Sequence, residues 1–418
     1  MRVLWITNMP LPEMQKHLGG NSVPYGGWLA SAAQGLTQFG NIELAVASVS
    51  SLANNLVRYQ LNGILHYAIP LGQGNIVYNK EYENYWRNIK KQFCPDLVHI
   101  HGTEFSHGLS YVKACGGDKV VVSIQGLVSA IERYSTGGLS NKEIIKNLTI
   151  RDLINKSSIF SEKEDYRKRG IIERELLKQV NHIIGRTTWD KAHVWAINPL
   201  ANYYVVNETL RIPFYDGRWQ YEKCTAHSIF LSQAGSALKG AHWVLQALPY
   251  VLFHYPDTKV IIAGKNIINN KGPLSWIKQT NYSKLLRGII DKFDLWGNIE
   301  FVGVLSAEEM KKCLLKSNLF ICPSSIENSP NSLGEAQILS VPCLASYVGG
   351  IPDLMCGFEY NMYRFDDIES LAKKICEIFD NKDKQADMSL LACRRHDRAE
   401  NAKQLLTTYK TILEKRVL

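Results

Sequence analysis

Short apolar runs alternate with stretches of helical spacing along most of the chain. Runs of this length, bounded by polar or turn residues, are typical of buried β-strands. Strands are predicted at Val3–Thr7, Glu43–Ser48, Leu65–Ile69, Leu97–His101, Val120–Ile124 and His182–Arg186, and then at Ile229–Ser232, Val260–Gly264, Ile299–Val302, Leu319–Cys322 and Leu344–Tyr347.

Amphipathic stretches between many of these strands predict helices. They are Trp28–Phe39, Glu81–Phe93, Ala241–His254, Tyr282–Phe293, Ala307–Lys316 and Leu333–Leu339. Alternation of strands and helices indicates an α/β protein whose parallel sheets are covered on both faces. Because the pattern stops and then restarts, we expect two Rossmann-like, doubly wound domains with a ligand cleft between them.

A break in the pattern marks the domain boundary. Residues 208–227 contain Pro and Gly and show no periodicity. We therefore predict an N-terminal domain at 1–210 and a C-terminal domain at 222–395. Residues 396–418 read as a helix that packs back toward the N-terminal domain. In an enzyme with a ligand cleft, the polar, helix-like insertion at 127–170 is a candidate for determining which acceptor substrate binds.

Composition agrees with a folded, two-domain protein. The chain has 418 residues, of which 45% are hydrophobic. No apolar run approaches the ~20 residues that span a bilayer, and the start of the chain reads as a strand rather than a signal peptide. Nine cysteines are scattered without a Cys-x-x-Cys pair. We expect reduced thiols, no zinc site and a cytoplasmic location.

Positive charge is concentrated in the first half of the chain. Residues 1–205 hold 22 Lys/Arg and 16 Asp/Glu, so +6 of the net +9 lies there. The runs Lys90-Lys91 and Arg167-Lys-Arg169 are consistent with peripheral contact between a basic N-terminal domain and anionic lipid, or with a solvated helix face. No recognised motif accompanies the charge, so no nucleic-acid partner is expected.

Two glutamates, eight positions apart, flank a predicted helix start. Glu327 lies in a loop rich in Ser, Asn and Pro that follows an apolar strand, and Glu335 lies on the first helical turns. A helix N-terminus offers unpaired N–H groups to phosphate or sugar hydroxyls, and carboxylates accept hydrogen bonds from sugar and ribose. This arrangement favours a nucleotide-sugar as ligand.

Three glycine-containing turns follow other predicted strands. They are Gly26-Gly27 near the start, Lys239-Gly240 before the first helix of the second block, and Gly349-Gly350 before Pro352. Glycine permits close approach of a ligand to the backbone, and a lysine at a strand end can neutralise a leaving phosphate. Taken singly, each is also typical of a plain loop or a surface lysine.

Polar residues also end strands of the first block. His101, Glu104 and His107 follow one strand and are candidate acceptor contacts, whereas His99 lies deeper and reads as a packing histidine. Arg186 ends the last strand of this block. It is a candidate for steadying a phosphate, with a structural ion pair as the alternative.

Together these motifs resemble the family 4 glycosyltransferases of the GT-B fold. The likeness covers nearly the whole chain and is strongest from Lys239 to Asp353. It depends on the early Gly-Gly loop, the Lys-Gly turn, Phe301-Val-Gly303-Val, the Glu-x7-Glu motif and the Gly-Gly-Ile-Pro turn.

The resemblance implies retaining sugar transfer from a nucleotide-sugar, with UDP as the expected nucleotide, without a metal or other cofactor. The acceptor would be a glycan or lipid-linked glycan of surface polysaccharide synthesis. Glu327 and Lys239 would be catalytic, touching donor hydroxyls and the leaving diphosphate respectively. The donor would also be held by Gly26, Gly27, Arg186, Lys265, Val304, Leu305, Asn331, Ser332, Leu333 and Glu335.

The sequence departs from the family pattern at two places. The arginine that usually precedes the Lys-Gly turn is absent from Ser232-Gln-Ala-Gly-Ser236, so Lys239 acts alone or with Arg186 or Lys265. Gln125 stands where the family often has histidine, and glutamine cannot shuttle a proton at neutral pH. A nucleotide-sugar-binding protein without transferase activity therefore remains the alternative.

Overall fold

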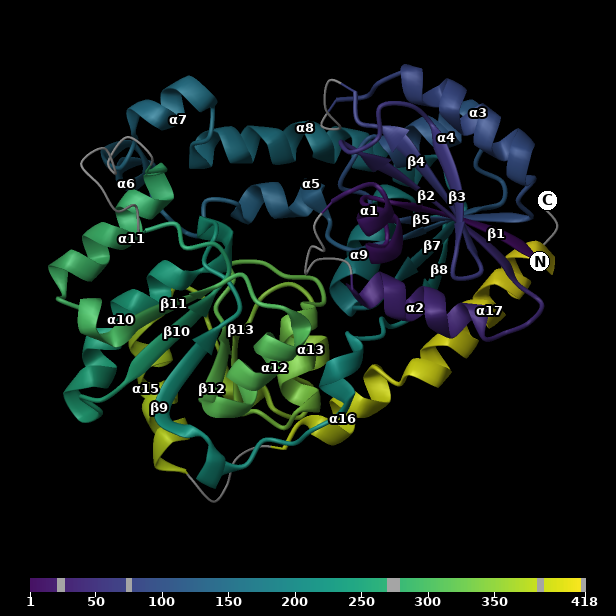
Figure 1. The fold of residues 1–418 in the computed structure, drawn as a ribbon. Coiled ribbons are helices and arrows are strands. Elements are labelled where there is room, and N and C mark those ends of the chain that lie inside the picture. Colours follow the sequence, from purple (N-terminus) through teal and green to yellow (C-terminus); the bar gives the residue numbers. More distant parts are fainter. Residues whose placement is uncertain (21–26, 73–76, 269–278, 382–386, 415–418) are drawn as a thin grey trace. The chain divides into compact units, whose positions relative to one another are not determined.

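The computed structural model describes residues 1–20, 27–72, 77–268, 279–381 and 387–414 (Figure 1). The chain divides into two compact units, each with its own parallel sheet. Unit 1 comprises Met1–Glu132, Asp165–Arg211 and Arg395–Leu418, and unit 2 comprises Arg133–Glu164 and Ile212–Arg394. The predicted fold class, α/β with two Rossmann-like domains, is confirmed.

Unit 1 contains an eight-stranded sheet in the order β3-β4-β2-β1-β5-β6-β7-β8. Every neighbouring pair is parallel except the hairpin of β3 and β4. The strands are β1 (Arg2–Thr7), β2 (Glu43–Ser50), β3 (Val57–Leu61), β4 (Ile64–Pro70), β5 (Leu97–His101), β6 (Val120–Ser123), β7 (His182–Gly185) and β8 (Asn202–Val205).

Helices cover both faces of this sheet, which explains why β1, β5 and β6 are almost entirely buried and rich in apolar residues. One face carries Leu4, Val98 and Val122 and packs with α3 and α4. The other face carries Val3, Trp5 and Val121 and packs with α2 and α17. The helices are α1 (Pro12–His17), α2 (Gly27–Thr37), α3 (Glu81–Phe93), α4 (His107–Cys115), α5 (Val128–Ile131), α8 (Ile159–Lys178), α9 (Thr188–Ile197) and α17 (Arg398–Glu414), with α8 beginning in unit 2.

Unit 2 contains a six-stranded parallel sheet in the order β11-β10-β9-β12-β13-β14. The strands are β9 (Thr225–Leu231), β10 (Lys259–Ala263), β11 (Ile299–Gly303), β12 (Ser317–Cys322), β13 (Cys343–Ser346) and β14 (Met362–Tyr363). The order reverses between β9 and β12. Ligands of such sheets bind beyond the carboxyl ends of the strands at this switch point.

The main core of unit 2 lies between one face of its sheet and α10, α11 and α15. Alternate residues of β9 show the division, since Ile229 and Leu231 belong to this core and Phe230 faces the other way, toward Phe320. The helices are α6 (Asn141–Lys146), α7 (Ile150–Asn155), α10 (Ala241–His254), α11 (Asn281–Lys292), α12 (Ala307–Lys316), α13 (Asn331–Ile338), α14 (Ile351–Leu354), α15 (Ile368–Asp380) and α16 (Ser389–Arg395).

The polar insertion belongs to unit 2, so the prediction of a continuous N-terminal domain over 1–210 is wrong for residues 133–164. Leu139, Ile144 and Ile159 of the insertion are buried in the core that contains α10 and α11. The backbone of the insertion is also attached to α10, because the carbonyl oxygen of Gly137 accepts a hydrogen bond from the ring nitrogen of Trp243 at 2.9 Å. The apolar residues of the insertion are separated by polar residues, so the sequence did not indicate which domain's core they would enter.

Strands β3, β8 and β14 were not predicted. β3 and β8 lie at the two edges of their sheet. β3 is largely exposed and lacks the apolar run that marks the central strands, whereas β8 is only four residues long and half-buried. β14 has only two residues.

Two bulk features of the chain can be described in the structure. None of the nine cysteines forms a disulfide in the part of the chain that is described. In the same residues, no helix combines the length and the apolar character needed to cross a membrane.

Candidate functional site

The carboxyl ends of β9, β12 and β13 bring three predicted motifs together in unit 2. Lys239 follows β9 in a short 3-10 helix, Ala237–Lys239. Glu327 lies in the loop after β12, and Gly349 in the turn after β13. These strands are neighbours in the sheet and run parallel, so their following loops share one edge at the switch point.

Lys239 and Glu327 form an ion pair at this edge. The Nζ of Lys239 donates to Oε1 of Glu327 at 2.6 Å, and the two side chains are 23% and 15% exposed. The hydroxyl of Ser324 donates to the same oxygen at 2.7 Å. Charge-assisted hydrogen bonds of this length are strong and fix the carboxylate in position. The two residues predicted to be catalytic therefore contact each other.

The glycines beside this pair allow close approach of backbone to backbone. Gly240 has φ +72°, and a Cβ there would lie 1.8 Å from the carbonyl oxygen of Pro323. Gly349 has φ +52°, and its Cβ would lie 2.0 Å from the carbonyl oxygen of Glu327. The N–H of Gly350 donates to that same oxygen at 3.0 Å. The second glycine turn thus holds the backbone of Glu327, a role that the sequence did not reveal.

Helix α13 begins close behind Glu327. Its first residues, Asn331 and Ser332, have no intrahelical partner for their N–H groups by helix geometry. The N–H of Leu333 donates to the carbonyl of Pro330 at 3.1 Å, so this predicted ligand contact is already engaged within the protein. The Oδ1 of Asn331 is buried and has no hydrogen-bond partner among the described residues. Glu335 lies one turn further along and is buried, with 2% exposure.

The remaining donor-side residues of unit 2 lie at the same sheet edge but further along it. Lys265 follows β10 and is exposed. Val304 and Leu305 follow β11, with Val304 53% exposed, and Ser306 then caps α12. The strand order places them one and two strands away from β9.

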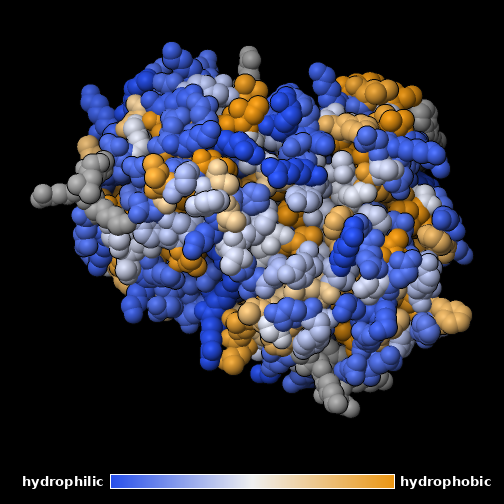
Figure 2. Space-filling view, turned by 180° about the vertical axis from the view of Figure 1, so that it is seen from behind, coloured by the Kyte–Doolittle hydropathy of each residue, from blue (hydrophilic) through white to orange (hydrophobic). Residues whose placement is uncertain are grey.

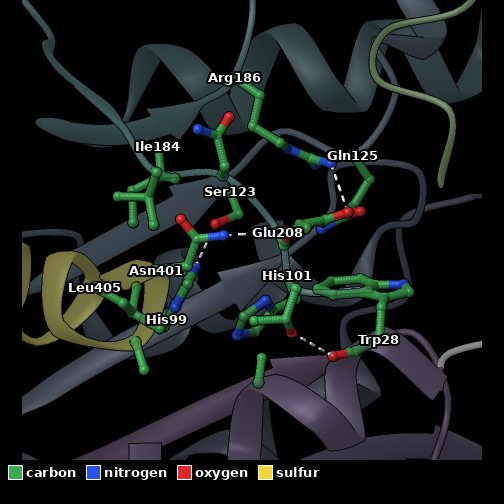
Figure 3. Close-up of a pocket in the computed structure, with 15 residues that line it drawn as sticks. Trp28, His99, His101, Ser123, Gln125, Ile184, Arg186, Glu208, Asn401 and Leu405 are labelled. Atoms are coloured by element: carbon green, nitrogen blue, oxygen red, sulfur yellow. Dashed lines mark hydrogen bonds and ion pairs between the residues drawn. The ribbon is translucent and has the colours of Figure 1, made fainter. Parts of the chain in front are cut away.

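A pocket in unit 1 gathers several of the other predicted residues (Figure 3). Arg186, His101 and Gln125 come from the carboxyl ends of β7 and β5 and from the loop after β6. Trp28 of α2 and Asn401 of α17 complete the wall. The pocket is also lined by residues that the sequence motifs did not point to: Trp28, Asn401, Ser123, Asn207, Thr209 and Glu208.

His101 has the clearest unmet hydrogen-bonding capacity in this pocket. Its side chain is buried, with 6% exposure, and neither ring nitrogen has a hydrogen-bond partner among the described residues. Burial lowers the pKa of His101 well below 6.5, as do His99 and Arg186. A neutral imidazole has one donor and one acceptor nitrogen, which suits a hydroxyl group that both donates and accepts. Buried polar groups normally have partners, so a ligand is expected here.

His99 differs from its neighbour, although their rings are only 3.7 Å apart. Its Nδ1 lies 2.6 Å from the hydroxyl of Tyr409, and its Nε2 lies 2.5 Å from the hydroxyl of Ser123. Both nitrogens are satisfied within the protein, so the prediction of a packing histidine is confirmed.

Arg186 makes a buried ion pair instead of remaining open to solvent. Its Nη1 lies 2.7 Å from Oε2 of Glu208, and the side chains are 3% and 10% exposed. The other guanidinium nitrogen donates to the carbonyl of Ile124. The contacts of Arg186 in unit 1 are therefore those of the alternative prediction, a structural ion pair. Arg186 and Glu208 also line the pocket.

Glu104 and His107 lie in a neighbouring network centred on Asn8. The Nδ2 of Asn8 donates to Glu104 at 2.9 Å, and its Oδ1 lies 2.9 Å from Nε2 of His107. Glu104 also accepts from the N–H of Gly126 at 3.2 Å. Burial raises the pKa of Glu104 and lowers that of His107 to about 4. These residues support the switch point between β1 and β5, and they do not line the pocket.

The early glycine loop is only partly described. Gly26 lies outside the described residues. Gly27 begins α2, and a Cβ there would meet the side chain of Arg211 at 3.2 Å. In the described residues, no cluster of three or more His, Cys, Asp or Glu side chains has the arrangement of a metal site.

Comparison with known proteins shows a similarity within the second unit. Residues 224–395 match the family model described as "Glycosyl transferases group 1". This match shows what the second unit is similar to, over less than half of the chain. This segment contains Lys239, Glu327, Glu335 and Gly349, so the ion pair and its glycine turn belong to the matched domain.

One relative and two solved structures extend the comparison. Over 169 residues the chain is 25% identical to a Corynebacterium glutamicum protein named GDP-mannose-dependent monoacylated alpha-(1-6)-phosphatidylinositol monomannoside mannosyltransferase, covering 39% of this chain and 40% of that protein. Sucrose-phosphate synthase from Thermosynechococcus elongatus is similar in structure, with TM-score 0.66, 12% identity and 99% of each chain covered.

The second solved structure is described as trehalose-6-phosphate from E. coli bound with UDP-2-fluoro glucose. It has TM-score 0.67 and 10% identity, and the match covers 100% of each chain. At these identities the likeness concerns the fold, which is the GT-B arrangement of two Rossmann-like domains. The group 1 domain and the fold together support the glycosyltransferase superfamily.

Proposed function

We propose that the chain is a retaining glycosyltransferase that moves a sugar from a UDP-sugar to a glycan or lipid-linked acceptor in surface polysaccharide synthesis. The observation that carries this proposal is the ion pair of Lys239 and Glu327, 2.6 Å apart at the switch point of the group 1 domain. The pair places a cation and a carboxylate where a nucleotide-sugar presents phosphate and hydroxyl groups.

Lys239 supplies the positive charge that the departing diphosphate needs. In the reaction, the bond between the anomeric carbon and the diphosphate oxygen breaks, and negative charge grows on that oxygen. A fixed ammonium stabilises this charge more in the transition state than in the ground state. We propose that this cation removes the need for a metal ion, so that chelators leave turnover unchanged.

Glu327 and α13 would position the donor. Glu327 accepts hydrogen bonds from the sugar hydroxyls, and the first amides of α13, at Asn331 and Ser332, donate to phosphate or sugar oxygens. The unpartnered, buried Oδ1 of Asn331 supports a polar ligand at this helix end. Glu335 would accept from the ribose, while Val304 and Leu305 would contact the base and Lys265 the phosphate.

The pocket of unit 1 would receive the acceptor. His101 offers one donor and one acceptor to a hydroxyl, Gln125 offers an amide, and Trp28 offers an aromatic face. The new bond forms between the acceptor oxygen and the anomeric carbon. We propose that the acceptor proton passes to an oxygen of the departing phosphate, because neither Gln125 nor a histidine of such low pKa is a suitable base at neutral pH.

Donor hydrolysis in the absence of acceptor tests the proposal. The protein is incubated with a panel of UDP- and GDP-sugars, and free nucleotide and the anomeric configuration of the released sugar are followed by NMR. We expect slow release of UDP with initial retention of configuration. GDP-mannose is included because the Corynebacterium relative is named for that donor.

The same experiment addresses the alternative function. Nucleotide-sugars that raise the melting temperature but release no nucleotide, even after candidate acceptors are added, would favour a binding protein without transferase activity. Inversion of configuration would contradict the retaining mechanism.

A further inference from the structure

The insertion carries a cluster of exposed aliphatic side chains on α6 and α7. Ile145 is 59% exposed, Ile150 62%, Leu153 71% and Ile154 74%. We call these four residues the insertion patch. All of them belong to unit 2, and they occupy only ten consecutive positions of the chain. Single exposed aliphatic residues are ordinary, whereas several gathered together mark an interaction surface.

The patch belongs to a well-anchored segment. Ile144, directly before Ile145, is 1% exposed and packs in the core of unit 2 together with Leu139 and Ile159. The hydroxyl of Thr149 donates to the carbonyl of Gln279 at 3.0 Å. The aliphatic side chains of the patch therefore point outward from a folded support, and their exposure does not result from a loose loop.

Helical spacing places three members of the patch on one side of α7. Ile150, Leu153 and Ile154 stand at positions i, i+3 and i+4, which share a helix face. Seen from behind, the surface has an orange area at its upper right margin, where α7 of Figure 1 comes to lie (Figure 2).

Positive charge surrounds the patch, and its acids are already engaged. Lys142, Lys146 and Lys156 are exposed in the same segment. Residues 141–156 contain four Lys/Arg and two Asp/Glu, a net +2. Both acids act as helix caps: Glu143 accepts from the N–H of Ser140 at 2.9 Å, and Asp152, 2% exposed, accepts from the N–H of Thr149 at 3.0 Å.

A further lysine lies close to the same surface. The Nζ of Lys284 in α11 lies 3.4 Å from the carbonyl oxygen of Lys146 and 3.5 Å from that of Leu148. The patch is therefore bordered by cations from two parts of unit 2.

We propose that the insertion patch docks unit 2 onto an anionic lipid bilayer. Aliphatic side chains that enter the acyl boundary, with lysines beside them at the headgroups, are the components of an interfacial membrane anchor. A protein partner is less well matched, because protein interfaces are enriched in aromatic residues, Met and Arg and depleted in Lys. The patch consists of Ile and Leu, and three of its exposed neighbours are lysines.

The docking surface differs from the one expected from the basic runs. Lys90 donates to the carbonyl of Cys115 at 2.7 Å, and Arg169 lies over the rings of Tyr166 and Phe105 at 4.6 and 5.7 Å. These cations have structural contacts in unit 1. The insertion patch combines exposed lysines with exposed aliphatic groups in one segment of unit 2.

Flotation with vesicles tests the docking. The full chain is mixed with vesicles of phosphatidylcholine alone or with added phosphatidylglycerol and centrifuged through a density gradient. We expect the protein to float with the anionic vesicles only. The variant Ile150→Ser/Leu153→Ser/Ile154→Ser should lose at least about tenfold in partition coefficient. The matched control is Leu390→Ser on α16, another leucine, 65% exposed, whose loss should not affect flotation.

Charge reversal provides a second test that leaves the aliphatic groups in place. Lys142→Glu/Lys146→Glu/Lys156→Glu should weaken binding by about fivefold or more for each cation, with an effect that salt diminishes. Lys223→Glu, at an exposed position outside the insertion, is the control. Unchanged melting temperatures would show that all variants fold.

Three outcomes would overturn the proposal. One is wild-type protein that does not float with anionic vesicles. Another is serine and charge-reversal variants that float as well as the wild type. The third is the absence of flotation together with a concentration-dependent dimer, seen by light scattering, that the serine variant abolishes; the patch would then be an interface between copies of the chain. None of these outcomes depends on sugar transfer.

Discussion

The ammonium of Lys239 lies 2.6 Å from a carboxylate oxygen of Glu327, although the two residues are 88 positions apart in the chain. The parallel neighbours β9 and β12 bring them to one sheet edge. Each restrains the other before any substrate arrives, which is the preorganisation that electrostatic catalysis requires.

Replacing Lys239 should damage turnover much more than folding. We expect Lys239→Ala to lower kcat by about 10²- to 10³-fold, the usual effect of removing one group that stabilises developing charge. The free energy of unfolding should fall by no more than about 1–3 kcal/mol, the cost of leaving one polar group unpartnered. Nucleotide release and urea denaturation measure the two quantities.

A suitable control for this variant is Lys311→Ala. The side chain of Lys311 is 14% exposed and lies 3.5 Å from Asp216, so it resembles Lys239 in burial and in having an acidic partner. Its loss should leave kcat within about twofold of wild type. Equal loss of activity in both variants would remove Lys239 from the proposed site.

Gly349→Ala should impair the site through Glu327. The added Cβ would lie 2.0 Å from the carbonyl oxygen of Glu327, so the loop that carries the carboxylate must move. A displacement of this kind commonly costs about 10²-fold in rate. We expect kcat to fall while the purified variant remains folded, as judged by circular dichroism.

Gly357→Ala is the control that separates displacement of the Glu327 loop from the cost of a positive φ at a residue other than glycine. Gly357 also has positive φ, +82°, but a Cβ there meets no atom within 4 Å. Positive φ alone should cost each variant about 1–2 kcal/mol of stability, because L residues disfavour it. Gly349→Ala should lose more, because its Cβ also meets the backbone of Glu327. Only Gly349→Ala should lose activity, and similar kinetics in the two variants would contradict the role assigned to the turn.

Glu335→Ala should weaken nucleotide binding. If Glu335 accepts from the ribose, the Kd for UDP should rise by about tenfold, the equivalent of one hydrogen bond. Isothermal titration calorimetry gives the value directly. Since Glu335 is buried, Glu335→Gln serves as a variant of nearly the same shape. Glu309→Ala, which removes an exposed capping acid of α12, should leave UDP affinity unchanged.

The contributions of Arg186 and Glu208 to the free energy of unfolding should depend on each other. Both side chains are at most 10% exposed, so removing one leaves the other buried without its partner. We expect Arg186→Met to cost about 3–5 kcal/mol, and the additional replacement Glu208→Leu to recover part of that loss. A double-mutant cycle on the exposed pair of Arg364 and Asp366 should give a coupling energy of only about 0–1 kcal/mol.

Acid should destabilise the protein below neutral pH. Burial lowers the pKa of six histidines: His66, His107, His242 and His396 to about 4, His99 to about 3, and His101 well below 6.5. Between these pKa values and 6.5, the unfolded chain binds protons that the native state does not. Their contribution to stability is therefore present above pH 6.5 and is lost as the pH falls.

Two carboxyl groups change the pH dependence of stability in the opposite direction. Burial raises the pKa of Glu173 to about 7 and also raises that of Glu104, so their contribution is present at low pH and is lost as the pH rises. Because the six histidines outnumber the two acids, the melting temperature should fall by several degrees between about pH 7 and about pH 5. His66→Asn should make this pH dependence shallower. A melting temperature that is constant or higher at pH 5 would contradict the assignment.

Local pattern was sufficient for the central strands and for recognising the motif around Glu327. Apolar runs predicted β1, β5, β6 and β12 because strands buried on both faces require such runs. The motif around Glu327 was recognisable because loop, helix start and acids are adjacent in the chain. The edge strand β3 was missed because it is exposed and carries polar residues, and the edge strand β8 was missed because it has only four residues.

The sequence by itself determined an α/β protein with two parallel sheets and a nucleotide-sugar motif, because strand burial and helix N-termini depend on residues close together in the chain. Only the tertiary structure decided that residues 133–164 join unit 2, that Glu208 is the partner of Arg186, and that Gly349 supports the backbone of Glu327. These relationships join distant segments. Their geometry depends on how strands order themselves in a sheet, which local periodicity does not encode.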